Sequence, residues 1–145
     1  MQRQKKKRPI HFLLIILTLL AIYCFFSRYE SPTGSNESNI GKLFEQKLSD
    51  VPVEGMGRVL RILPDDKKGL PHQRFILVLP SGSHVLIAHN IAIAPKIPGL
   101  YHGAKVYFKG VYEWNSKGGV VHWTHKDPRG KHPDGWLEFN GTLYQ

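Results

Sequence analysis

One long apolar run near the N-terminus constrains this chain more than any other feature. Ile10–Phe26 holds 17 residues interrupted only by His11 and Thr18, and five lysines and arginines lie within the eight residues that start the chain. As a helix the run is about 25 Å long, close to the roughly 30 Å of a hydrocarbon core. Because such cations stay on the cytoplasmic side, we expect a basic cytoplasmic segment over residues 1–9 and a single transmembrane anchor over residues 10–28.

A cleaved signal peptide is the alternative interpretation of this segment. Its apolar region is typically shorter and is followed closely by a cleavage site of small residues. Tyr23 is too bulky for such a site, and Thr33-Gly34-Ser35 lies seven residues beyond the apolar run. Tyr23 is also too large for a lipoprotein signal before Cys24. Both interpretations export the residues that follow.

The charge of the chain is unevenly distributed. The formal net charge is +9, but residues 27–49 hold three basic and three acidic residues, and residues 50–145 hold twelve basic and eight acidic ones. The exported part is therefore only mildly basic, which weakens the usual association of a basic protein with nucleic acid. Cys24 is the only cysteine, so residues 27–145 have no disulfide, thiolate metal site or cysteine nucleophile.

Residues 29–50 are predicted to be a tether. They are rich in serine, asparagine, glycine and proline up to Ser38, and a short helix is expected over Gly41–Leu48. Leu43, Phe44 and Leu48 would share one face of this helix. That face could lie against the following domain or against a membrane surface.

Residues 51–145 show the pattern of a mainly β domain. Short apolar runs are separated by glycine, proline, aspartate and asparagine, with no sustained helical period. Five or six strands in about 95 residues predict a small OB-like barrel, with a small sandwich as the alternative. The expected strands are Glu54–Leu63, Gln73–Leu79, His84–His89, Lys105–Trp114, Gly119–Thr124 and Trp136–Tyr144, the last with a turn at Asn140-Gly141.

The clearest alternation lies in Lys105–Trp114. Side chains of successive residues in a strand point to opposite faces, so one set here should be buried and the other solvated. By the same rule Val121 and Trp123 should share a buried face. The predicted core residues are Val106, Phe108, Tyr112, Val121 and Trp123, and the predicted solvated residues are Lys105, Tyr107 and Lys109.

A run of distinctive residues connects the chain to a known family. The stretch Val121–His132, with His-Trp-Thr-His followed by Asp127-Pro128, resembles an uncharacterised bacterial family labelled domain of unknown function 3465. Gly135-Trp136 and the terminal Tyr144-Gln145 agree with it, and the resemblance covers about residues 51–145. It implies membership but no activity. With a bacterial source, the anchor would lie in the inner membrane and the domain in the periplasm or outside the cell.

Several histidines and aspartates are candidate metal ligands. Imidazole and carboxylate groups bind first-row divalent metals when they converge on one ion. On a regular strand His122 and His125 would point to opposite faces, so we expect them to diverge, and we expect His125 to hydrogen-bond loop backbone near Asp127–Gly135. The candidate ligands are His89, His122, His125, Asp127 and His132.

A basic and aromatic surface is the second candidate site. Exposed aromatic rings can stack on bases or sugars while nearby cations hold phosphates or carboxylates. Tyr107 and Trp114 are the aromatic residues expected to be available, since the others must fill a small core. The candidate ligand-binding residues are Tyr107, Lys105, Lys109, Trp114 and Arg129.

Three functions therefore remain open. The first is a membrane-tethered extracytoplasmic module that binds an anionic polymer, either nucleic acid or envelope polysaccharide. The second is a metal-dependent hydrolase in which the histidine and aspartate residues hold an ion that activates water. The third is a structural role in contact with an envelope protein. No phosphate loop, dinucleotide fingerprint or nucleophile elbow is present in the sequence, so no small-molecule cofactor is evident.

Overall fold

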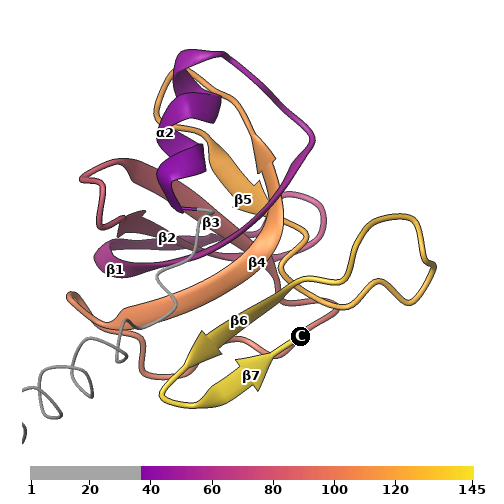
Figure 1. Ribbon diagram of the computed structural model, residues 1–145. Coiled ribbons are helices and arrows are strands. Elements are labelled where there is room, and N and C mark those ends of the chain that lie inside the picture. Colours follow the sequence, from indigo (N-terminus) through magenta and orange to yellow (C-terminus); the bar gives the residue numbers. More distant parts are fainter. Residues whose placement is uncertain (1–36) are drawn as a thin grey trace, which may run out of the picture. The chain divides into compact units, whose positions relative to one another are not determined.

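The computed structural model describes residues 37–145 (Figure 1). The predicted cytoplasmic segment, the predicted anchor over residues 10–28 and the start of the predicted tether lie outside the described residues. None of the helices in the described part is long and apolar enough to cross a membrane. The elements are α2 (Glu37–Glu45), β1 (Val51–Asp66), β2 (His72–Val78), β3 (His84–Asn90), β4 (Lys105–Glu113), β5 (Val120–His122), β6 (Trp136–Phe139) and β7 (Thr142–Tyr144).

Five strands form a closed ring, in the order β1, β2, β3, β5, β4 and back to β1. Strand β1 closes it because its first half, Val51–Arg58, pairs with β4 and the rest, as far as Asp66, pairs with β2. All pairings are antiparallel except that between β3 and β5. The prediction of a mainly β fold is confirmed, and the sheet is barrel-like.

Strands β6 and β7 extend the ring as a hairpin, with β6 paired to β4 (Figure 1). The hairpin turns at Asn140-Gly141, as predicted, with φ values of 51° and 75°. Positive φ at both central residues is what a two-residue turn of type I′ requires, and asparagine followed by glycine adopts it most readily. The single predicted strand Trp136–Tyr144 is thus two short strands.

The interior of the ring is filled by alternate side chains of each strand. In β2, Phe75 and Leu77 are fully buried, and in β4, Val106 and Phe108 are fully buried while Lys105 and Tyr107 are exposed. The predicted alternation is therefore confirmed from Lys105 to Phe108, but it fails further along β4, where Val111 on the predicted solvated face is buried as well. Tyr112 and Val121 are also buried as predicted.

Trp123 departs from the predicted burial pattern. Strand β5 ends at His122, and Trp123 has a φ of 52°, in the left-handed region that few non-glycine residues adopt. The alternation therefore stops one residue before Trp123, and its side chain is 38% exposed. The prediction that Trp123 belongs to the core was wrong for this reason.

Helix α2 packs on the ring. Ile40 and Leu43 are buried in the main core, whereas Phe44 and Leu48 are exposed. The predicted apolar face was therefore correct only at Leu43, because the helix starts at Glu37 and ends at Glu45 rather than spanning Gly41–Leu48. Part of the predicted tether thus contributes to the core of the domain.

The two faces of β4 give a test of the register. Phe108→Ala should lower the free energy of unfolding by about 3–5 kcal/mol, as for other large core truncations. Lys109→Ala, on the neighbouring residue, should cost well under about 1 kcal/mol because its side chain is half exposed. Urea unfolding of the two variants measures the difference, and equal losses would show that the register is wrong.

Candidate functional site

A cavity of about 590 Å³ lies where the chain leaves β5. Residues from the ends of β2, β3 and β5 meet there with the loop that leads to β6. Apolar, aromatic, imidazole and charged groups all contribute to it. The lining residues are Leu70, His72, Ala88, Asn90, Ile93, His122, Trp123, His125, Asp127, Pro128, Arg129, Lys131 and His132.

The loop from Lys126 to Gly135 is organised by Asp127. Its carboxylate accepts hydrogen bonds from the backbone N–H groups of Arg129 and His132, both at 2.8 Å, and from that of Lys131. Partial burial opposes the charged form, but these three donors hold the pKa of Asp127 below its usual value. Both oxygens are therefore engaged in shaping the loop, and Asp127 stays ionised.

Gly135 anchors the far end of the same loop. Its N–H donates to the carbonyl of His125 at 2.9 Å. A Cβ here would overlap the carbonyl oxygen of Trp123 and lie 2.6 Å from that of Lys109. Only glycine lets the backbone at position 135 come this close to the backbone of Trp123 and Lys109. This contact packs the end of the loop against β4 and the residues that follow β5, and so positions the loop wall of the cavity.

Three rings gather on one side of the cavity. The centroids of Trp123 and His132 are 4.0 Å apart, and His125 lies 5.8 Å from Trp123 and 5.4 Å from His132, edge to face in both cases. Trp123 is partly exposed, whereas His125 is 1% exposed. The indole of Trp123 therefore packs against the imidazole rings of His125 and His132, and part of its surface remains exposed at the cavity.

His125 has one ring nitrogen in use and one without a partner. Its Nδ1 lies 2.6 Å from the carbonyl oxygen of Lys126. A carbonyl only accepts hydrogen bonds, so Nδ1 carries the proton and Nε2 of the neutral ring is an acceptor. That Nε2 is buried and has no hydrogen-bond partner among the described residues. The predicted hydrogen bond of His125 to loop backbone is present, through Lys126.

His122 lies beside the same cavity. Its Nε2 is 3.7 Å from a carboxylate oxygen of Glu113. Burial lowers the pKa of His122, and the nearby Glu113 partly offsets this. His122 and His125 both line this cavity, because β5 ends at His122 and the chain turns at Trp123.

His89 does not belong to this site. It is fully buried inside the ring, where Nε2 donates to the carbonyl of Pro95 at 3.1 Å and Nδ1 accepts from the Thr124 hydroxyl at 2.9 Å. Burial lowers its pKa to about 4, so the ring is neutral at physiological pH. With Gln73, which binds the backbone of Ile97, His89 closes one end of the interior.

The predicted metal ligands are thus only partly assembled. His122, His125, Asp127 and His132 share the cavity, but the oxygens of Asp127 are held by backbone donors and His132 binds the carbonyl of Pro133. Across residues 37–145, no three histidine, cysteine, aspartate or glutamate side chains are placed to hold one metal ion.

The predicted ligand-binding residues fall into three separate places. Lys105 and Tyr107 lie on the outer face of β4, with the Lys105 ammonium 5.7 Å from the ring centroid. Trp114 instead contacts α2: its indole N–H donates to the Phe44 carbonyl at 3.1 Å, and the two rings are stacked. Arg129 lines the cavity described above. The structure therefore does not bring these residues into one surface.

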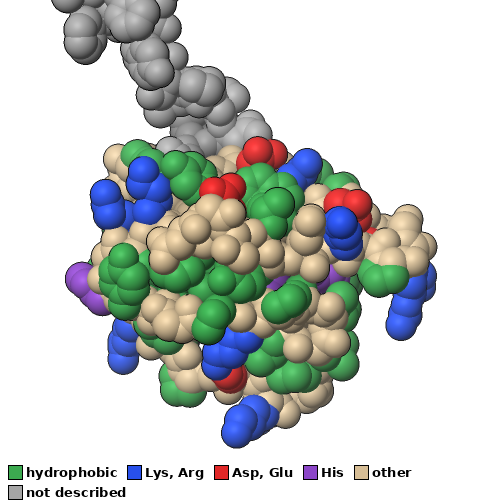
Figure 2. All heavy atoms as spheres, turned by 90° about the horizontal axis from the view of Figure 1, so that it is seen from below, with side chains coloured by type: hydrophobic (Ala, Val, Ile, Leu, Met, Phe, Trp, Pro, Cys, Tyr) green, Lys and Arg blue, Asp and Glu red, His purple; other side chains and the backbone are tan. Residues whose placement is uncertain are grey.

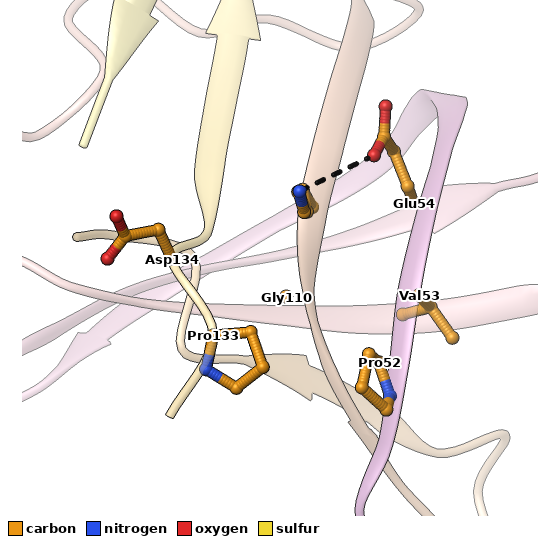
Figure 3. Close-up of a pocket in the computed structure, with 7 residues that line it drawn as sticks. Pro52, Val53, Glu54, Gly110, Pro133 and Asp134 are labelled. Atoms are coloured by element: carbon orange, nitrogen blue, oxygen red, sulfur yellow. Dashed lines mark ion pairs between the residues drawn. The ribbon is translucent and has the colours of Figure 1, made fainter. Parts of the chain in front are cut away.

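Lys109 borders a second, much smaller hollow of about 90 Å³ (Figure 3). Glu54 lies 3.9 Å from its ammonium, and Asp134 lies on the opposite side of the hollow in Figure 3. Two carboxylates beside one lysine leave no excess positive charge for an anionic ligand. Figure 2 shows the lysines and arginines of one face scattered singly among apolar side chains, which also argues against a broad basic patch there.

Several cavity residues were not singled out by the sequence. Leu70 and Ile93 lie in connections far apart in the chain, and Asn90 ends β3. The sequence offered a signal for only two of the others: His72 is a polar residue at the start of an apolar strand, and Lys131 is one of several lysines and arginines. The segments that hold Leu70 and Ile93 are brought together by the pairing of His72 with Asn90 and by the hydrogen bond from the Ile91 N–H to the Pro71 carbonyl at 2.9 Å.

The fold and the site together define a mainly β protein with a closed five-stranded ring and a cavity lined by tryptophan and histidine. The chain belongs to the family described as "Protein of unknown function (DUF3465)", whose model matches residues 21–145. This confirms the resemblance found in the sequence and extends it toward the N-terminus. No match was found among curated proteins.

The buried His89 predicts a pH dependence of stability. Because its pKa in the folded chain lies below the ordinary 6.5, the unfolded chain gains a proton first as the pH falls. The free energy of unfolding should therefore drop by about 3 kcal/mol between about pH 6.5 and about pH 4. His89→Gln should lack this share of the decrease, as measured by urea unfolding across that range.

The same substitution at the exposed His102 is the matched control for the loss of a histidine. An unchanged pH profile in His89→Gln would mean that His89 is not buried in its neutral form.

Proposed function

We propose that this protein is a membrane-tethered extracytoplasmic module with an OB-like barrel, and that its cavity beside β5 binds an anionic polymer. The observation that carries the proposal is the combination of a large cavity, a partly exposed indole and two cations on its wall. Arg129 and Lys131 both line the cavity, and among the described residues neither side chain has an ion-pair partner. Stacking surfaces beside cations are the usual elements of single-strand and acidic-polymer recognition.

The strand order supports the finer assignment of the fold. A five-stranded ring in the order β1, β2, β3, β5, β4, with the single parallel pairing between β3 and β5, is the arrangement of OB folds. In such folds the ligand lies against the sheet between connecting loops. The cavity here lies against β2, β3 and β5 and is closed by Leu70 in the connection from β1 and by the loop after β5.

The proposed location rests on residues 1–28. The apolar run and the cations before it favour a single-pass anchor with residues 51–145 on the far side of the inner membrane. A reporter that is active only outside the cytoplasm, fused after Gln145, should be active. Activity of the corresponding cytoplasm-only reporter would contradict this orientation.

The polymer-binding proposal is tested with the full chain in detergent. A fluorescent single-stranded DNA and an acidic polysaccharide serve as probes, because each offers one of the two polymer chemistries. The double variant Arg129→Gln/Lys131→Gln should bind the preferred probe roughly tenfold more weakly, with a shallower salt dependence, since each lost contact to a single strand removes about 0.7 from the slope.

Lys126→Gln is the matched control, because Lys126 is exposed in the same loop but does not line the cavity. The N-terminal cations are present in all variants, so their contribution cancels in the comparison. Equal affinities for the control and the double variant would contradict the proposed site.

A metal-dependent hydrolase is the second candidate, and one observation favours it. A histidine that donates Nδ1–H to a backbone carbonyl and leaves Nε2 free, as His125 does, has the arrangement of many metal ligands. The other groups in the cavity do not complete a set of three. Elemental analysis of the purified chain without a histidine tag distinguishes the two functions, because stoichiometric metal that is lost in His125→Asn would favour the hydrolase.

A further inference from the structure

Helix α2 carries apolar side chains on two sides. Ile40 and Leu43 are buried in the main core, whereas Phe44 and Leu48 are 38% and 43% exposed. The sequence left open whether the apolar residues of this segment lie against the domain or against a membrane surface. In the part of the chain that the structure describes, Leu43 belongs to the core, and Phe44 and Leu48 form the start of a second, uncovered apolar surface.

The position of Leu48 is determined by the way in which α2 ends. The N–H of Leu48 donates to the carbonyl of Leu43 at 3.0 Å, and the N–H of Lys47 donates to the carbonyl of Phe44 at 3.2 Å. Lys47 has a φ of 55°. These two hydrogen bonds around a left-handed residue form a Schellman motif, which holds the backbone of Leu48 beside the last turn of the helix.

Trp114 enlarges this apolar surface from a distant part of the chain. Its indole N–H donates to the carbonyl of Phe44 at 3.1 Å, and the two rings are stacked with centroids 6.4 Å apart. Its backbone N–H donates to the hydroxyl of Ser49 at 2.9 Å, and its side chain is partly exposed. Phe44, Lys47, Leu48 and Trp114 are called the α2 patch below.

Lys47 occupies a position that glycine usually takes. A side chain in the left-handed region is unfavourable, and glycine ends many helices there for this reason. The ammonium of Lys47 lies 5.7 Å from the centroid of the Trp114 ring. Lysine side chains cover apolar surface with their stems and keep the charge in water, and lysine and tryptophan are both typical of membrane interfaces.

The charges around the α2 patch are balanced. Lys42 and Lys47 are exposed, and so are Glu45 and Asp50. A strongly acidic or strongly basic protein would therefore gain little from contact with this surface. An aromatic and aliphatic surface of low net charge instead suits the interface of a lipid bilayer.

The length of chain before α2 keeps the patch near a membrane. Residues 29–36, eight in all, connect the predicted anchor to α2, which starts at Glu37. Eight residues span at most about 29 Å, and Phe44 lies about 10 Å further along the helix. The patch can therefore reach the bilayer but cannot move far from it. A short tether gives an effective concentration on the order of millimolar, so a weak contact by a few side chains is sufficient.

We propose that the α2 patch lies against the surface of the bilayer that holds the predicted anchor, with its apolar side chains in the interface and the Lys47 ammonium among the headgroups. This inference rests on the proposed location of the chain but not on the proposed ligand of its cavity. It goes beyond both, because it gives the domain one preferred orientation on the membrane.

The test uses the full chain in nanodiscs of phosphatidylethanolamine and phosphatidylglycerol, whose acyl chains carry either bromine near the headgroup or no bromine. Bromine quenches tryptophan fluorescence at short range, and the chain has three tryptophans, Trp114, Trp123 and Trp136. The variant Trp123→Phe/Trp136→Phe retains Trp114 alone. It should lose about half its fluorescence in the brominated lipid, because interfacial apolar faces are buried about 5–10 Å into the boundary of headgroups and acyl chains.

Further substitutions in the chain that retains Trp114 alone assign the quenching to the patch. Phe44→Ser/Leu48→Ser should remove most of it, and Leu48→Ser by itself should reduce it while the Phe44–Trp114 contact remains. The matched control is Tyr107→Ser/Leu143→Ser, which should be quenched as before. These two side chains are 39% and 51% exposed and lie near the start of β4 and in β7, away from α2 in Figure 1.

Two further measurements complete the test. The quenching should persist at high salt, because the charges around the patch balance and the contact is apolar. If the chain with Trp114 alone does not fold, the difference in quenching between the wild type and Trp114→Phe tests the same contact.

Four outcomes would overturn the inference while the anchor stands. They are the absence of Trp114 quenching, quenching that Phe44→Ser/Leu48→Ser leaves unchanged, loss of quenching at high salt, and a dimer in detergent that the same substitutions dissociate, since a second copy would then cover the patch. Loss of residues 1–28 in the intact mass of the purified chain, or a reporter active only in the cytoplasm, would overturn the proposed location and the inference together.

Discussion

The structure depends on β1 pairing with two neighbours at once. Its first half lies beside β4 and its second half beside β2, with register shifts after Val59 and Leu63. Irregularities of this kind bend a strand, and this bend lets one strand close the sheet. Closure removes the free edges that β1 and β4 would otherwise present. It also creates the enclosed interior in which Phe75, Phe108 and Tyr112 are buried.

One end of that interior is closed by polar groups rather than by apolar ones. Gln73 and His89, which face each other on β2 and β3, bind the backbone of Ile97 and Pro95 and the hydroxyl of Thr124. Each buried group thereby keeps a partner. Thr124 follows Trp123 directly, so its buried hydrogen bond to His89 also fixes the backbone next to the exposed indole. The packing of the core therefore helps to position Trp123 in the candidate site.

The candidate site arises where regular structure stops. At His122 the short strand β5 ends, Trp123 takes a left-handed backbone, and the chain enters the loop organised by Asp127 and Gly135. A continuing strand would have buried Trp123 and separated His122 from His125. The end of the strand instead turns Trp123 outward and places both histidines on one cavity, which the alternation rule could not predict.

The sequence by itself determined the mainly β class, the alternation in the first half of β4 and the hairpin at Asn140-Gly141, because these follow from local periodicity and turn chemistry. It also identified the family through the run Val121–His132. Only the tertiary structure decided that His89 is a buried support, that Trp114 packs on α2 and that Leu70, Ile93 and Arg129 line one cavity. These outcomes depend on strand pairing and loop closure between residues far apart in the chain, which no local pattern encodes.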